Sequence, residues 1–329
     1  MDLKHLLKRG ALLAAANWQI VAIQFVAETT FQVLLVVPIL GAAILVAVLL
    51  GGNLADLLHG TPREMFTSIA SALLAEPVAL SAFITSLALV LLGGSVLTFA
   101  VKGGTVEVLV AANVAAGPIE SEPLTFETFR SASRYTLDRF MAGCTRLFRP
   151  YLGLGFVLMI VYGLSVGGYL AFVVYGYRAV EGRALLIGWT FIAAIAAAVL
   201  VAWITLVNLL YLLLQVAMAI EGIRLGEACR AASRFIRAEF RELAGVFLIV
   251  FALVVAATLA SALAWSGVGL IAFVPLVGLA VFPLQIAALL LRGLVFEYLG
   301  LTALGAYVTL YQGHVARAPK AVAEVLATA

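Results

Sequence analysis

The stretch from Leu243 to Gln312 contains only two charged side chains in seventy residues, Arg292 and Glu297. A helix that crosses a bilayer needs roughly 20 predominantly apolar residues, whereas a soluble core helix buries only one apolar face. No water-soluble domain could bury so long a stretch. The rest of the chain agrees, because 11% of all residues are charged, against roughly 25% in soluble domains. The sequence therefore predicts an integral membrane protein.

Hydrophobic length divides the chain into six expected transmembrane helices. We expect an all-α fold in a single polytopic membrane domain, residues 1–329, with spans at residues 30–50, 78–101, 151–176, 185–219, 243–264 and 282–312. Pro38 should kink the first span, because proline removes a backbone donor and clashes with the preceding turn. Pro283 should lie near the start of the last span.

Three segments between or beside the spans carry local signals. Trp265–Ala280, which holds three glycines and one proline, could form an interfacial loop, a re-entrant hairpin or a seventh crossing, and we favour a loop or hairpin. Thr61-Pro62-Arg63-Glu64 is typical of a helix start, so a short external helix is expected at about 62–74. Lys102-Gly103-Gly104-Thr105 lacks the remaining P-loop residues and indicates a flexible helix exit.

Charge asymmetry predicts the orientation. With six spans, the segments on the N-terminal side hold three, six, five and two basic residues, sixteen in all, whereas the opposite side holds three. By the positive-inside bias, both termini are expected in the cytoplasm. We expect a multi-pass protein of a cell membrane, and the lack of eukaryotic targeting signals favours a bacterial inner membrane. Cys144 and Cys229 fall in the cytoplasmic segments and should be free thiols.

An internal repeat appears when Glu127–Phe140 is laid over Glu227–Phe240, because six of fourteen positions are identical. The identical pairs are Glu127/Glu227, Arg130/Arg230, Ala132/Ala232, Ser133/Ser233, Arg134/Arg234 and Phe140/Phe240. Chance similarity between two basic amphipathic helices is the alternative. Each copy precedes two long apolar segments, and Asp2, His5 and Arg9 keep the same spacing at the start of the chain. We expect three units, at about 1–115, 116–220 and 221–329, each a basic helix followed by a helical hairpin.

The basic helices have the pattern of helices that lie along a membrane surface. In the third copy Ala228, Ala232 and Phe235 recur at helical spacing, opposite a face of arginines. We expect the apolar stripe to enter the acyl boundary and the arginines to face anionic headgroups. The predicted surface residues are Arg130, Arg134, Arg230, Arg234, Arg237 and Arg241.

Glu28, Arg292 and Glu297 are the ionisable residues expected at membrane depth, where charges are costly. Arg292 and Glu297 are five residues apart, so they point to different sides of a helix and each needs another partner, such as Glu28 for Arg292. One interpretation is a polar clamp that holds the last helix in the bundle. The other is a transport or lipid-headgroup site.

No catalytic pattern has its required context. Gly163-Leu164-Ser165-Val166-Gly167 matches a nucleophile elbow, but that motif needs a strand-turn-helix and a histidine partner. The same glycines form a GxxxG pattern that favours close helix packing. Without a P-loop, an HExxH motif or a clustered metal site, the sequence predicts no enzyme activity, cofactor or metal, and the small net charge of +3 does not indicate nucleic-acid binding.

The segment Ala219–Phe235 (AIEGIRLGEACRAASRF), followed by a new span, resembles bacterial six-helix membrane families of uncharacterised function. The ending Thr302–Gln312, with its two tyrosines, is similar too. These families include the membrane domain associated with glycerophosphoryl diester phosphodiesterases. In those proteins a separate soluble barrel of roughly 200 or more residues performs catalysis. Only seventeen residues follow Gln312 here (329 minus 312), so we do not expect the enzyme activity.

Two classes of function therefore stand as hypotheses. The first is a non-catalytic scaffold, accessory or assembly component that acts on partner proteins or lipids, alone or as a homo-oligomer. The second is a transporter or flippase of a lipid or other amphiphile, with Glu28, Arg292 and Glu297 around a midplane polar site.

Overall fold

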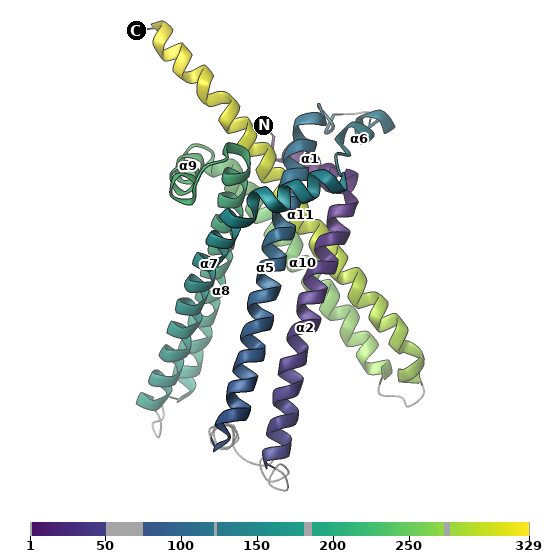
Figure 1. The fold of residues 1–329 in the computed structure, drawn as a ribbon, viewed down its shortest axis with the longest axis vertical. Helices are drawn as coiled ribbons and strands as arrows, with labels where there is room; N and C mark the ends of the chain where they lie inside the picture. Colours follow the sequence, from purple (N-terminus) through teal and green to yellow (C-terminus); the bar gives the residue numbers. More distant parts are fainter. Residues whose placement is uncertain (1, 51–74, 122–123, 181–185, 273–276, 329) are drawn as a thin grey trace. The chain divides into compact units, whose positions relative to one another are not determined.

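The computed structural model describes residues 2–50, 75–121, 124–180, 186–272 and 277–328. Every regular element in these ranges is a helix (Figure 1). The helices are α1 (Leu3–Ala16), α2 (Trp18–Leu50), α5 (Pro77–Ala115), α6 (Phe126–Ala132), α7 (Leu137–Val180), α8 (Leu186–Glu221), α9 (Leu225–Ala238), α10 (Phe240–Ala272) and α11 (Val277–Thr328). The all-α fold is thus confirmed for the described ranges.

Six segments of the described residues are long and apolar enough to cross a membrane, which confirms a multi-pass membrane protein. They are Trp18–Leu45, Leu80–Ala115, Phe126–Val180, Gly188–Glu221, Phe240–Ala264 and Pro283–Arg317. Most extend beyond the expected spans, because the helices continue into polar sequence at one end. Pro38 lies inside α2, and Pro283 lies near the start of α11, as expected.

Two expectations about connecting segments need correction. The loop alternative for residues 265–280 is wrong for 265–272 and 277–280, because these residues continue α10 and begin α11; residues 273–276 lie outside the described ranges, and the hairpin alternative stays a prediction. Lys102–Thr105 is not a flexible exit but part of α5. Its glycines allow a close helix contact, since a Cβ at Gly103 would lie 3.0 Å from the Gly143 carbonyl oxygen of α7. The helix expected at 62–74 also lies outside the described residues.

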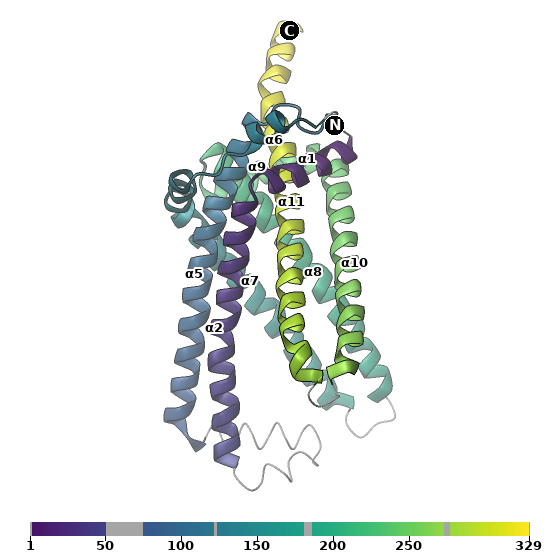
Figure 2. The ribbon, with the colours of Figure 1, turned by 90° about the vertical axis from the view of Figure 1, so that its right-hand side faces the viewer.

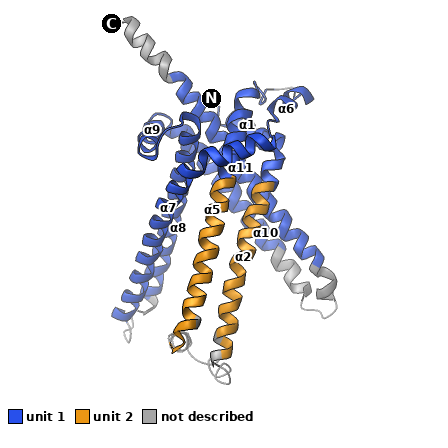
Figure 3. Cartoon of the chain, viewed as in Figure 1, with its two compact units in different colours: residues 1–22, 102–329 blue, residues 23–101 orange. Residues whose placement is uncertain are grey.

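The chain divides into two compact units, which are described separately (Figure 3). The larger unit comprises residues 1–22 and 102–329, and the smaller comprises residues 23–101, with most of α2 and the first part of α5. The largest fully buried side chains all belong to the larger unit: Tyr151, Tyr311, Phe235, Leu6, Leu13, Ile20, Leu109, Ile119, Leu213, Leu301, Val106 and Val108. They lie in α1 and α9, in the parts of α2, α5, α7, α8 and α11 that belong to the larger unit, and, for Ile119, in the turn after α5.

Within the larger unit, α1 lies across α10 and α11 (Figure 2). Gly10 makes this crossing possible, because a Cβ there would lie 2.8 Å from the backbone nitrogen of Ala306 and closer still to the Thr302 carbonyl oxygen. Gly305 faces it from α11, where a Cβ would lie 3.1 Å from the Cα of Gly10. The Tyr298 hydroxyl also donates to the Ala11 carbonyl at 3.1 Å. The first helix is therefore fixed backbone to backbone against the last.

The two copies of the sequence repeat have different local structures. The second copy forms one helix through Ala238, whereas the first ends at Ala132 and α7 begins only at Leu137. Asn17 accounts for the difference. Its Oδ1 accepts the backbone N–H groups of Arg134 and Tyr135 at 2.8 and 3.0 Å, and its Nδ2 donates to Ala132 O at 2.9 Å. These backbone groups would otherwise bond within a continuous helix.

Candidate functional site

Helix α9 is attached to the larger unit by its apolar face. Ala228, Ala232 and Phe235 are buried, and the Phe235 ring lies 4.9 Å from that of Tyr311 and 5.4 Å from that of His314, both on α11. The prediction that this stripe enters the acyl boundary is therefore wrong for these residues. A buried stripe on protein gives the same sequence pattern as one in lipid, because both media are apolar.

The opposite face of α9 is exposed and basic. Arg230, Arg234 and Arg237 lie on this face, and Arg241 follows in the first turn of α10. Arg130 of α6 and Arg134 beyond its end are exposed as well. All six residues predicted at the membrane surface thus present their side chains outward.

A groove of about 710 Å³, lined mainly by polar and charged residues, lies beside α9 at the turn that joins it to α8. Glu221 ends α8, and Gly222 adopts a positive φ of 66°, a conformation that favours glycine and lets the chain reverse into α9. The groove is lined by Glu221, Ile223, Glu227, Cys229, Arg230, Ser233 and Arg234. We define these seven residues as the α9 groove.

The carboxylates and the guanidinium groups of the α9 groove differ in their partners. Glu221 accepts a short hydrogen bond from the Tyr311 hydroxyl, and Glu227 accepts the backbone N–H of Arg224 at 3.4 Å. Neither Arg230 nor Arg234 makes a hydrogen bond or ion pair with another residue in the part of the chain that the structure describes. The groove therefore has two positioned acceptors and two cations free to bind an anion.

Ion pairs and hydrogen bonds hold the elements around the groove. Arg146 of α7 forms a short ion pair with Glu107 of α5 and donates to the Ala219 carbonyl at 3.0 Å. At the other end of α9, Glu239 binds Arg317 at 2.7 Å. Residues of α5, α7, α8 and α11 make these contacts, so several helices of the larger unit hold the surroundings of the groove in place.

Arg9 of α1 forms a second polar cluster, which is part-buried. Its guanidinium donates to Asn113 Oδ1, Gly117 O and Glu120 Oε2, each at 2.6 Å. Asn113 in turn donates to Gln312 of α11 at 2.6 Å. The side chains of Arg9 and Glu120 are only 11% and 15% exposed, so this is a structural clamp among α1, α5 and α11 and not an open site.

The residues predicted at membrane depth fall in different units. Glu28 belongs to the smaller unit, where its carboxylate accepts from Gln32 at 3.5 Å along the same helix. Arg292 and Glu297 belong to α11 in the larger unit. Arg292 is exposed, with its guanidinium carbon 5.6 Å from the centre of the Phe296 ring, and Glu297 is half-buried. A common site of the three stays a prediction.

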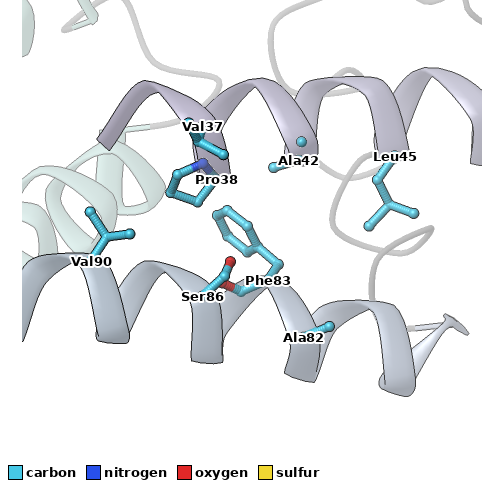
Figure 4. A pocket seen from close by; sticks show the side chains of 9 residues that line it. Val37, Pro38, Ala42, Leu45, Ala82, Phe83, Ser86 and Val90 are labelled. Atoms are coloured by element: carbon cyan, nitrogen blue, oxygen red, sulfur yellow. The ribbon is translucent and has the colours of Figure 1, made fainter. Parts of the chain in front are cut away.

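Two further grooves lie along spans. In the smaller unit, Pro38 of α2 and Phe83 of α5 help to line an apolar groove of about 520 Å³ (Figure 4). In the larger unit, a groove of about 360 Å³ between α7 and α8 includes Ser165, whose hydroxyl accepts from Trp203 at 3.0 Å. The GxxxG packing prediction is wrong for contacts among the described residues, since a Cβ at Gly163 or Gly167 would meet none of their atoms within 4 Å.

The arginines of the α9 groove were predicted from the sequence, whereas Glu227, Ser233 and Arg9 were named only as repeat positions. No role was predicted for Glu221, Asn17 or Asn113. A polar residue directly after the apolar run Ala14–Ala16 was the available signal for Asn17. Among the described residues, no group of three His, Cys, Asp or Glu side chains could hold a metal ion.

The α9 groove is identified as a candidate site by its geometry and not by similarity to a known protein. No family model matches the chain, and neither a curated protein nor a solved structure is significantly similar to it.

Proposed function

We propose that this protein is a non-catalytic membrane scaffold or accessory component that organises lipids or partner proteins through the exposed arginines at one end of its helices. One observation carries the proposal. Phe235 and its small neighbours fix α9 to the body of the larger unit, so Arg230, Arg234 and Arg237 form a rigid outward-facing surface. Each basic residue near an anionic bilayer contributes about 1 kcal/mol of attraction.

The order of the elements supports a three-unit construction of this surface. The short helices α1, α6 and α9 each precede long helices, and the sequence repeat relates the second and third units. On this proposal, a basic helix precedes each membrane hairpin. We propose that this basic end faces the cytoplasm, as the positive-inside bias predicts, in a bacterial inner membrane.

The test is gentle release of the protein from its own membrane, followed by native mass spectrometry of every retained lipid and chain. Arg237→Gln with Arg241→Gln should lower the retained anionic lipid or partner several-fold. Arg178→Gln, an exposed basic residue in the last turn of α7, is the control and should change nothing. Equal retention by all three proteins would contradict the proposal.

One observation favours transport of an amphiphile as a second candidate. Arg292 is exposed inside the span Pro283–Arg317, and a charge at such depth normally pairs or faces water. In a lipid-scrambling assay, Arg292→Ala should abolish transport while the protein remains folded. Loss of folding would instead support a structural clamp.

A further inference from the structure

We propose that the α9 groove binds a headgroup that carries both a phosphate and a primary ammonium, as in phosphoethanolamine lipids. The arginines would take the phosphate and the carboxylates would take the ammonium. This inference rests on the proposed function in one respect, because it requires the basic end of the helices to lie at the headgroup level of a bilayer.

The phosphate half of the site consists of Arg230, Arg234 and Ser233. Residues four apart lie one above the other on the same face of a helix, so the two guanidinium groups converge on one volume. Guanidinium forks match phosphate oxygens with two parallel hydrogen bonds, and the Ser233 hydroxyl adds a donor. Arg230 and Arg234 form no ion pair with another described residue, so both charges are available to a phosphate.

The ammonium half consists of Glu227 and Glu221. Two glutamates balance the two arginines, so the groove has no net formal charge, although its surroundings are basic. A headgroup with only negative charge would gain from the arginines but lie against both carboxylates. A phosphate joined by two carbons to an ammonium satisfies both pairs, because the ammonium donates three hydrogen bonds to acceptors.

The position of the groove suits a lipid better than a free solute. Glu221 is the last residue of the span Gly188–Glu221, so the groove opens where the apolar segment ends. A lipid bound there by its headgroup can leave its acyl chains in the bilayer beside α8. The volume of about 710 Å³ accommodates a phosphoethanolamine group with its glycerol.

The test uses the full chain in nanodiscs of equal phosphatidylethanolamine, phosphatidylcholine and phosphatidylglycerol content, with retained lipid scored by native mass spectrometry. We expect about tenfold preference for phosphatidylethanolamine over phosphatidylcholine, whose quaternary ammonium cannot donate hydrogen bonds. Arg230→Gln with Arg234→Gln should remove the retained lipid. Glu227→Gln should reduce the preference for the primary amine while keeping phosphate binding. Arg178→Gln, which removes an exposed charge in the last turn of α7, is the control and should leave both lipid retention and lipid preference unchanged.

Protection of Cys229 gives an independent readout, because this exposed thiol lines the groove. Phosphatidylethanolamine should slow its modification by maleimide several-fold, and Ser233→Trp, which fills the groove without changing charge, should abolish lipid retention. Soluble phosphoethanolamine that protects Cys229 without any retained lipid would overturn the lipid assignment.

Equal retention of phosphatidylglycerol, or retention unchanged by the double arginine variant, would overturn the groove proposal. Neither result by itself refutes the proposed function, which has a separate test in Arg237→Gln with Arg241→Gln. Conversely, Arg237→Gln with Arg241→Gln could leave lipid retention unchanged while the groove still selects phosphatidylethanolamine. That result would refute the proposed function alone.

Discussion

Asn17 uses both ends of its side-chain amide to set the boundary between α6 and α7. It is fully buried, accepts two backbone N–H groups from the segment after Ala132 and donates to the Leu13 and Ala132 carbonyls. Four hydrogen bonds from one amide satisfy its whole bonding capacity. Asn17, at the end of α1, thereby separates α6 from α7, more than one hundred positions later in the chain.

Replacing Asn17 with alanine should therefore release the backbone after α6. Leaving buried groups unsatisfied costs about 1–3 kcal/mol, so stability should fall by that order. Amide hydrogen exchange at Arg134 and Tyr135 should become at least tenfold faster. Ser131→Ala, which removes only a bond to Thr128 within α6, is the control. Unchanged exchange in the Asn17 variant would refute this account.

Gly10 is the second residue on which a helix contact depends. Gly10→Ala should separate α1 from α11 and lower stability by about 1–3 kcal/mol, because the new methyl group meets backbone atoms that cannot move aside. Gly300→Ala in α11 is the control. Its new methyl group would meet no atom of the described residues within 4 Å, so stability should stay equal or rise slightly. Thermal unfolding in detergent compares the two, and equal melting temperatures would contradict the close packing.

At the scale of elements, Arg9 links three helices and a loop. Arg9→Ala should cost about 3–5 kcal/mol, because it leaves the Glu120 carboxylate buried without its partner. Hydrogen exchange across α1 should rise sharply. Lys4→Gln, an exposed change on the same helix, should have no effect.

A second variant distinguishes the contribution of the Arg9–Glu120 ion pair from the cost of leaving Glu120 without its partner. Arg9→Met combined with Glu120→Gln removes both charges and should recover part of the lost stability, since no isolated charge remains. If the double variant were as unstable as Arg9→Ala, the hydrogen bonds to Asn113 and Gly117 would be the larger contribution.

The number of spans could be predicted from the sequence, because hydrophobic length is a local property of each segment. The docking of α9 could not, since an apolar stripe such as Ala228, Ala232 and Phe235 looks the same whether lipid or protein covers it. The side of the groove formed by Glu221 and Glu227 could not be predicted either. It depends on the turn at Gly222, which brings the end of α8 beside α9. The arginines were predictable because their spacing is helical.

At the scale of the whole molecule, tight packing and apolar exposure occupy different parts of the chain. The most apolar windows of the spans Phe126–Val180 and Gly188–Glu221 contain no buried residue, whereas residues 301–311 of α11 are buried without interruption. An apolar surface of this extent is stable only against lipid or other membrane helices. The larger unit thus combines a tightly packed region with long helices whose outer faces suit a bilayer.

The two cysteines provide a direct test of which side the packed end faces. Cys229 is exposed on α9 and Cys144 is half-buried in α7. With Cys144→Ser as background, a membrane-impermeant maleimide should label Cys229 in inverted membrane vesicles but not in intact spheroplasts, because the positive-inside bias predicts a cytoplasmic side for the sixteen basic residues. An Arg178→Cys variant in a chain without the native cysteines should show the opposite pattern. Labelling of Cys229 in intact spheroplasts would reverse the topology and remove the anionic cytoplasmic leaflet from the proposed function.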